Sequence, residues 1–144
     1  MKSLILPLLL LSAVCNANQM SDCKDLNVDL RSLTVPLEES SKSFLDDSVQ
    51  LYKIDQIEPA CCSVGVAVVI NDAQSEVPGV SKCFAVMGYT GANIPNTQLV
   101  HSRSRGTLLI IPASTYNPEG DGTSLDTELV LKLDLPNSNV SVLE

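Results

Sequence analysis

The chain has 144 residues and a formal net charge of −8 at pH 7, and aromatic residues make up only 3% of it. An acidic protein repels the phosphates of nucleic acids, so nucleic-acid binding is not expected. The shortage of aromatic side chains also weakens any role that depends on stacking against bases or sugars.

The N-terminus is typical of a secretory signal peptide. Lys2 precedes an apolar run over residues 4–14, and the chain then leads to Ala17, after which we expect cleavage. The run is shorter than the roughly 20 apolar residues that span a bilayer, so a membrane anchor is not expected. A lipid-modified Cys15 is a less favoured alternative, because Val14 is bulkier than that processing site usually allows.

This prediction sets the domain organisation and the compartment. Residues 1–17 would be removed, and residues 18–144 would form a single domain with a core of its own. We expect the mature protein to be secreted and extracellular, or periplasmic if the source is a Gram-negative bacterium, with no membrane insertion after cleavage.

Apolar and polar residues alternate in many short stretches, which predicts β-strands. The first stretch, residues 25–30, slips in phase at residues 31–32 and resumes over residues 33–37, where Pro36 favours an edge. Residues 38–48 are polar and predict a surface loop with room for one helical turn. The remaining predicted strands cover residues 49–57, 61–71, 82–90, 108–111, 125–135 and 140–143.

Residues 61–70 are predicted to form the central strand. From Cys62 the even positions carry bulky residues, whereas the odd positions include the smaller Ser63, Gly65 and Ala67. Small side chains on one face indicate that something packs closely there, most simply a facing sheet.

The number and spacing of these stretches predict an all-β fold, an antiparallel β-sandwich of about seven or eight short strands that disulfides staple together. The expected outline is immunoglobulin-like, but the chain has no Trp and so lacks the Cys-Trp-Cys hallmark of true immunoglobulin domains. The prediction therefore concerns architecture only and implies no function.

Four cysteines remain after signal cleavage: Cys23, Cys61, Cys62 and Cys83. An even number in an exported chain favours two disulfides, and the spacing does not fit a zinc site. Free thiols are a further alternative.

The pairing depends on whether residues 61–71 and 81–90 form a simple hairpin. In that hairpin Cys62 would lie about 23 Å along the strand from the position opposite Cys83, whereas a disulfide needs Cα atoms within about 7 Å. We favour a different topology, in which Cys23 and Cys83 each bond one of the two adjacent cysteines. The alternative is a Cys23–Cys83 bond together with a strained bridge between the adjacent cysteines, which would be the more functional arrangement.

His101, Arg103 and Arg105 are the best candidates for binding residues. In an extended segment they point to one face, where they could bind a carboxylate, sulfate or phosphate group. A charged edge strand that discourages aggregation is the plainer explanation and receives more weight. Because His101 is the single histidine and no nucleophile motif accompanies it, no catalytic residue is assigned.

Two weaker sites complete the candidates. A calcium site could use Glu119, Asp121 and Asp126, although their spacing does not match an EF-hand loop and a plain turn is favoured. Asn139 begins an Asn-Val-Ser sequon, which is a glycosylation candidate if the source is eukaryotic. No cofactor and no metal are expected.

These observations predict a class of function and no specific activity. We expect a small exported binding or interaction protein without a catalytic role, whose partner is a protein or a small anionic ligand. The alternative is a structural subunit of an extracellular or cell-surface assembly, completed by strand exchange between chains. A redox protein that uses Cys61 and Cys62 is a third hypothesis. The oligomeric state does not follow from the sequence.

Overall fold

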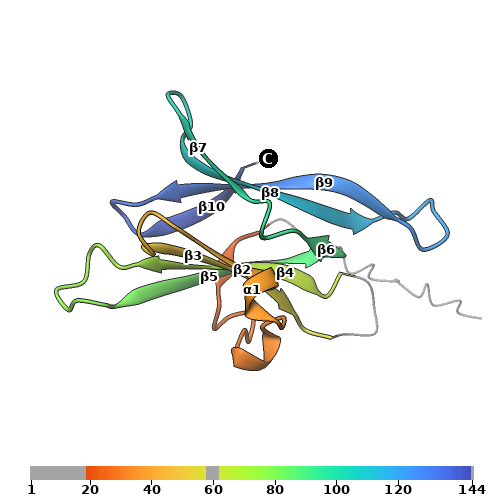
Figure 1. The fold of residues 1–144 in the computed structure, drawn as a ribbon, viewed down its shortest axis with the longest axis horizontal. Helices are drawn as coiled ribbons and strands as arrows, with labels where there is room; N and C mark the ends of the chain where they lie inside the picture. Colours follow the sequence, from red (N-terminus) through yellow and green to blue (C-terminus); the bar gives the residue numbers. More distant parts are fainter. Residues whose placement is uncertain (1–18, 58–61, 144) are drawn as a thin grey trace, which may run out of the picture.

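The computed structural model describes residues 19–57 and 62–143, which form two antiparallel sheets (Figure 1). The spatial order of the first sheet is β1 (Ser21–Asp22), β5 (Ser81–Tyr89), β4 (Val64–Asn71), β3 (Val49–Asp55) and β2 (Ser41–Phe44). The order of the second sheet is β10 (Asn139–Leu143), β9 (Ser124–Asp134), β8 (Gly106–Tyr116) and β6 (Gly91–Ala92), and β7 (Gln98–Ser102) also pairs with β8. The predicted β-rich fold is confirmed, with ten strands in the described residues.

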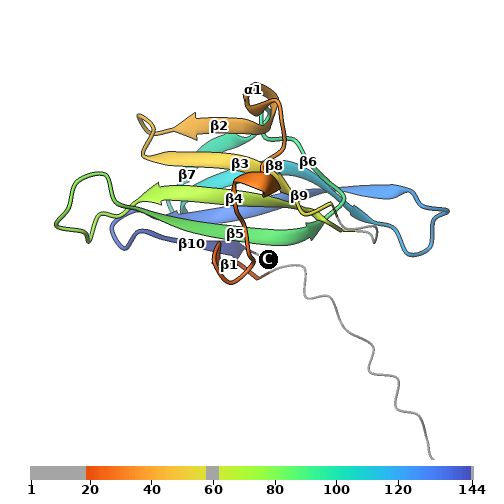
Figure 2. The same cartoon turned by 90° about the horizontal axis from the view of Figure 1, so that it is seen from below.

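Most neighbouring strands are joined by hairpins. The chain forms β2 to β5 in succession and then crosses to the second sheet. There it forms the short strand β6, followed by β7 to β10 in succession. Figure 2 shows that β1 and β2 lie at opposite edges of the first sheet. The helices of the described residues are short: a 3-10 helix over Leu30–Ser32 and α1 over Leu37–Ser40.

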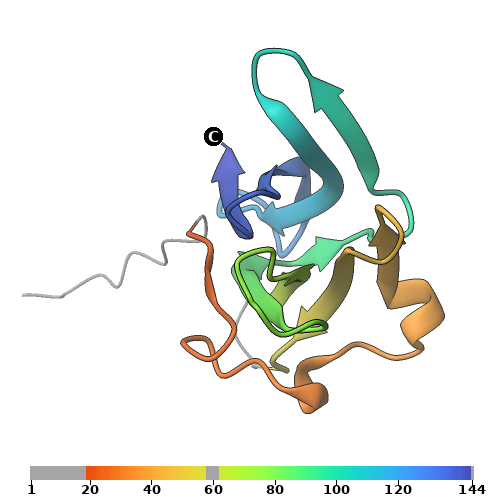
Figure 3. The same ribbon diagram turned by 90° about the vertical axis from the view of Figure 1, so that its left-hand side faces the viewer.

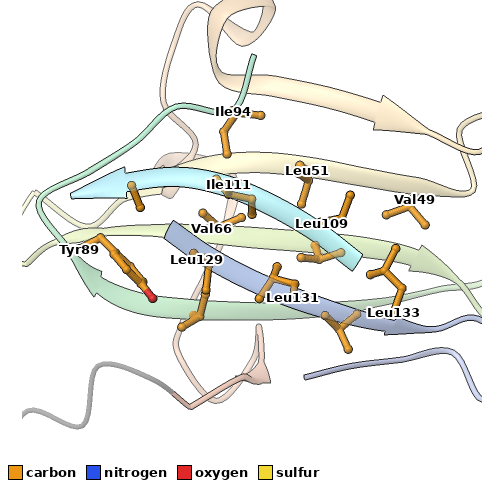
Figure 4. Close-up of a cluster of buried hydrophobic side chains, with 14 of the residues drawn as sticks. Val49, Leu51, Val66, Tyr89, Ile94, Leu109, Ile111, Leu129, Leu131 and Leu133 are labelled. Carbon is orange, nitrogen blue, oxygen red and sulfur yellow. The ribbon is translucent and has the colours of Figure 1, made fainter. Parts of the chain in front are cut away.

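The bulky face of β4 points toward the second sheet. Val66 and Val68 are fully buried in a core cluster that also contains Leu51 of β3, Leu109 of β8 and Leu131 of β9 (Figure 4). Burying a side chain of this size contributes roughly 1.5–3 kcal/mol relative to leaving it exposed. One shared core therefore holds the two sheets together.

The small face of β4 is covered in a different way from the prediction. We expected a facing sheet there, but Ala67 belongs to a second cluster with Cys23, against which Leu26 and Val28 pack. The covering element is thus the N-terminal segment. Gly65 and Ala67 leave space near the backbone, which an irregular segment fills as well as a sheet does.

The N-terminal segment itself was predicted to begin with a strand over residues 25–30, and this prediction is wrong. Asn27 has a φ of 53°, in the left-handed region, and Asp29 caps the following 3-10 helix by accepting a hydrogen bond from the Arg31 N–H at 2.8 Å. Such local side-chain bonds to the backbone compete with strand pairing. Within this loop Leu26 and Val28 pack against the first sheet, whereas Leu30, the third apolar residue of the pattern, is 85% exposed.

The next predicted piece, residues 33–37, does not form a strand of the sheets. Leu33 makes an isolated bridge to Ile54, and α1 begins at Leu37. The predicted loop over residues 38–48 contains most of α1 and the edge strand β2.

The register of β4 and β5 determines which cysteines can form a disulfide. These strands form the simple hairpin, with Val69 opposite Cys83. Cys83 is bonded to Cys23, with Cα atoms 5.4 Å apart. The favoured prediction, in which Cys23 and Cys83 each bond one of the adjacent cysteines, is therefore wrong, because the hairpin carries Cys83 away from Cys62. Cys61 lies outside the described residues.

The strand predicted over residues 108–111 is longer than expected, since β8 continues through Pro112 to Tyr116. The Asn93 N–H donates to the Pro112 carbonyl at 2.8 Å. Because the N and O atoms of a strand residue point to the same side, the missing N–H of Pro112 faces this edge and not β9. The ladder between β8 and β9 is therefore uninterrupted.

The disulfide yields a first prediction. The variant C23A/C83A should lose about 4 kcal/mol of unfolding free energy by the chain-entropy account, because the bond closes a loop of 60 residues. Urea unfolding of the variant and the parent measures the loss. An unchanged midpoint would show that the N-terminal segment covers the first sheet without the bond.

A second prediction concerns Gly65, where a Cβ atom would collide with the Val86 carbonyl and with the Met87 sulfur. The substitution Gly65→Ala should cost about 1–3 kcal/mol of stability, because backbone atoms must move to accept the methyl group. Thermal unfolding tests this. A variant as stable as the parent would contradict the tight packing on this face of β4.

Candidate functional site

The two sheets differ in what covers their outer faces. The outer face of the first sheet lies under the N-terminal segment that carries Cys23, Leu26 and Val28. Over the outer face of the second sheet, no segment of the described chain lies, and the hairpin of β7 and β8 rises beside it (Figures 1 and 3). The outer face of the second sheet is thus the uncovered face of the fold.

This uncovered face carries a set of side chains that we call the apolar row. Leu109 and Leu131 point into the core, so the side chains that alternate with them along the strands point outward. The apolar row consists of Val100, Leu108, Ile110, Val130 and Leu143. Leu108 is only 5% exposed, and the other four side chains are partly buried.

An open groove of about 1330 Å³ begins at one end of the apolar row. It runs from Val130 of β9 past β6 to the region of α1. Its charged residues are Glu39, Asp126, Glu128 and Lys53, so carboxylates outnumber amines in it. We call it the acidic groove.

The predicted cationic residues lie beyond the other end of the apolar row. His101 is in β7, while Arg103 and Arg105 are in the turn at residues 103–105 that joins β7 to β8. The three side chains are exposed. We call this element, residues 101–105, the basic hairpin tip.

The geometry of the tip differs from the extended strip that we expected. Gly106 has a φ of 82°, and the Arg105 N–H donates to the Ser102 hydroxyl at 3.2 Å, so the chain closes a tight three-residue turn there. His101 pairs with Thr107 across the hairpin, and its Nδ1 lies 3.1 Å from the Thr107 hydroxyl. The two arginines therefore lie in the turn, whereas His101 lies within β7, before the turn begins.

Charge is sorted along the uncovered face. Proceeding along β9, Asp126 and Glu128 come first, Val130 lies in the middle and Lys132 follows toward the basic hairpin tip. Asp134 is the exception at the basic end, where its carboxylate accepts hydrogen bonds from Asn137. The face is thus acidic at one end, apolar in the centre and mainly basic at the other end.

The ion pairs of the described residues lie elsewhere. They join Arg31 to Asp29 and Lys82 to Asp72. The carboxylates of the acidic groove and the arginines of the basic hairpin tip therefore lack an ion-pair partner within the described chain. A partner of opposite charge would not have to displace an existing contact.

The candidate calcium residues are not assembled into a metal site. Glu119 and Asp121 lie in the turn between β8 and β9, whereas Asp126 lies on the outer face of β9 opposite Ser114. Among the described residues, no three Asp, Glu, His or Cys side chains are grouped so that they could hold a metal ion.

Cys61 and Cys62, on which the redox hypothesis depends, belong to the connection between β3 and β4, at the end of this hairpin. Cys62 has a φ of 78°, in the left-handed region, and Cys61 lies outside the described residues, so the hypothesis of a Cys61–Cys62 bridge stays a prediction. Asp55 organises this end: its carboxylate accepts hydrogen bonds from the Ser63 hydroxyl at 2.7 Å and from the Ile57 N–H at 2.9 Å. These bonds, the one from Ser63 above all, lower the pKa of Asp55 below its ordinary value.

The glycosylation candidate Asn139 is the first residue of β10 and is exposed. Its side chain is therefore accessible for modification, and its use stays a prediction.

The sequence alone did not reveal the uncovered face. Residues 108–111 were predicted as a buried strand, and half of them point outward into the apolar row. The acidic groove was missed because Glu39 is far from Asp126 and Glu128 in the sequence. The continuous apolar run in β8 was the one sequence signal of this face. Without the strand register, its residues could not be divided between the core face and the outer face of the sheet.

No protein-family model matches the chain, and neither a curated protein nor a solved structure matches it. In the residues that the structure describes, none of the helices has the length and apolarity that crossing a membrane requires.

A third prediction follows from Asp55. Because its pKa is lowered in the folded state, its carboxylate stabilises the fold above the unfolded-state pKa of about 3.9, and this contribution is lost as the pH falls through the folded pKa. Asp55→Asn should therefore be less stable than the parent at pH 7, with a gap that narrows as the pH falls below about 4. Urea unfolding at several pH values measures it. A gap that is the same at all pH values would contradict this role.

Proposed function

We propose that this chain is an exported, non-catalytic binding protein whose contact surface is the uncovered face of the second sheet. The observation that carries the proposal is the pair of arginines, Arg103 and Arg105, on a hairpin that stands away from an acidic body without an ion-pair partner in the described chain. Arginine binds carboxylates through two parallel N–H donors, and the partner we propose is a macromolecule that presents carboxylates.

The architecture belongs to the same proposal. Two antiparallel sheets around one core support a β-sandwich. The proposed similarity to an immunoglobulin-like outline is limited to this arrangement of two sheets. The hairpins that join successive strands give the chain a simpler path than true immunoglobulin domains have.

Export is the compartment that we propose. The Cys23–Cys83 disulfide is compatible with an oxidising extracellular or periplasmic location. The expected signal peptide, residues 1–17, lies outside the described residues and supports export through its sequence alone.

The fourth prediction tests the basic hairpin tip with poly-L-glutamate, a simple polymer of carboxylates. The mature protein should bind immobilised poly-L-glutamate at low ionic strength although both are acidic, and added salt should weaken the binding. The variant R103E/R105E should lose at least tenfold in apparent affinity.

The control is K24E/R31E, which changes the net charge equally at two exposed residues of the N-terminal segment. Because Arg31 pairs with Asp29, circular dichroism verifies that this variant folds. It should bind like the parent protein. Equal losses in both variants would show that only net charge matters, and an absence of binding by the parent protein would contradict the proposed function.

A further inference from the structure

We infer that the partner is a second copy of this chain, and that the basic hairpin tip of each copy binds in the acidic groove of the other. The inference rests on the proposed function, because it names the carboxylates that the arginines bind. Its support is the charge, the placement and the size of the two elements.

Charge complementarity is the first argument. The acidic groove contains Glu39, Asp126 and Glu128 against Lys53 alone, and the basic hairpin tip contributes Arg103 and Arg105. Neither set is engaged in an ion pair within the described residues. Each copy thus offers both halves of a salt-bridged contact and uses neither of them internally.

Placement on one face is the second argument. A two-fold axis that lies in the plane of contact and runs perpendicular to the strands reverses the strand direction of the partner, so the basic end of one copy meets the acidic end of the other. If the axis passes the Ile110–Val130 pair, Lys132 of one copy faces Glu128 of the second, since both lie two residues from Val130. The same rotation produces the reciprocal contact.

The reach of the hairpin agrees with this arrangement. Arg105 is five residues from Ile110, about 17 Å along β8, and Asp126 is four residues from Val130, about 13 Å along β9. In this arrangement the backbone positions of the two residues lie about 4 Å apart along the strand direction on opposite copies. The hairpin rises from the sheet in Figures 1 and 3, which lets it extend past the strands of the partner into the groove.

Size and polarity complete the argument. The groove, about 1330 Å³, exceeds the roughly 300–1,000 Å³ typical of pockets for small ligands, so it has room for several side chains of a hairpin turn. Between the two charged contacts, the apolar row of one copy would lie on that of the other and remove Ile110 and Val130 from water. Charge at the ends would fix the orientation of this apolar contact.

The test is sedimentation velocity over a series of protein concentrations, with the mature protein and two charge-reversal variants. The parent protein should form dimers as its concentration rises. R103E/R105E and D126R/E128R should each weaken self-association by at least tenfold, because in either homodimer both contacts join like charges. Each substituted residue is exposed, and circular dichroism verifies that the variants fold.

An equimolar mixture of the two variants is the decisive measurement. In the heterodimer, the carboxylates that R103E/R105E introduces at the hairpin tip meet the guanidinium groups that D126R/E128R introduces in the groove. The native arginines of the second variant meet the native carboxylates of the first. The mixture should therefore recover dimers that neither variant forms alone. The control pair K24E/R31E and D25R/E76R, altered at exposed residues away from the face, should dimerise like the parent protein.

The inference is overturned if the parent protein is monomeric at every concentration, if both reversals leave dimerisation intact, or if the mixture stays monomeric. A monomer that binds poly-L-glutamate through Arg103 and Arg105 would remove the second copy as partner and leave the proposed function standing. A monomer that does not bind the polymer would overturn both. D126R/E128R should still bind poly-L-glutamate, since its basic hairpin tip is unchanged.

Discussion

The alternation of bulky and small residues along β4 determines what packs on each side of the first sheet. Its bulky face, with Val66 and Val68, fills the core that the two sheets share, so this face must point toward the second sheet. Its small face, with Gly65 and Ala67, leaves room only for something close to the backbone. The N-terminal segment occupies that room and is bonded there through Cys23 and Cys83.

The two outer faces of the fold differ as a result. The first sheet is covered by the chain's own N-terminal segment, whereas the second sheet presents the apolar row between the acidic groove and the basic hairpin tip. Our proposal of a contact surface rests on this apolar centre with charged ends, because burial would supply affinity and charge would supply orientation.

The sequence predicted the strands with strong alternation, such as residues 125–135, because their pattern is decided locally by one buried face. It predicted a strand over residues 25–30 that does not form. There the cap that Asp29 provides and the left-handed backbone of Asn27 outweigh the alternation of polar and apolar residues. It named Arg103 and Arg105, but the turn that presents them depends on Gly106 and on pairing with β8. Glu39 joins Asp126 and Glu128 through tertiary structure, which no local pattern predicts.

Hydrogen–deuterium exchange of the mature protein, compared between dilute and concentrated solution, would show where two copies meet, because it reports which backbone segments a contact covers. If two copies meet through the uncovered face, exchange should be slower at high concentration in the turn at residues 103–105 and in the groove segments around Asn93 and Glu39, with no change around the N-terminal 3-10 helix. Protection confined to the first sheet, or exchange that is independent of concentration, would contradict the claim that the uncovered face of the second sheet binds another copy.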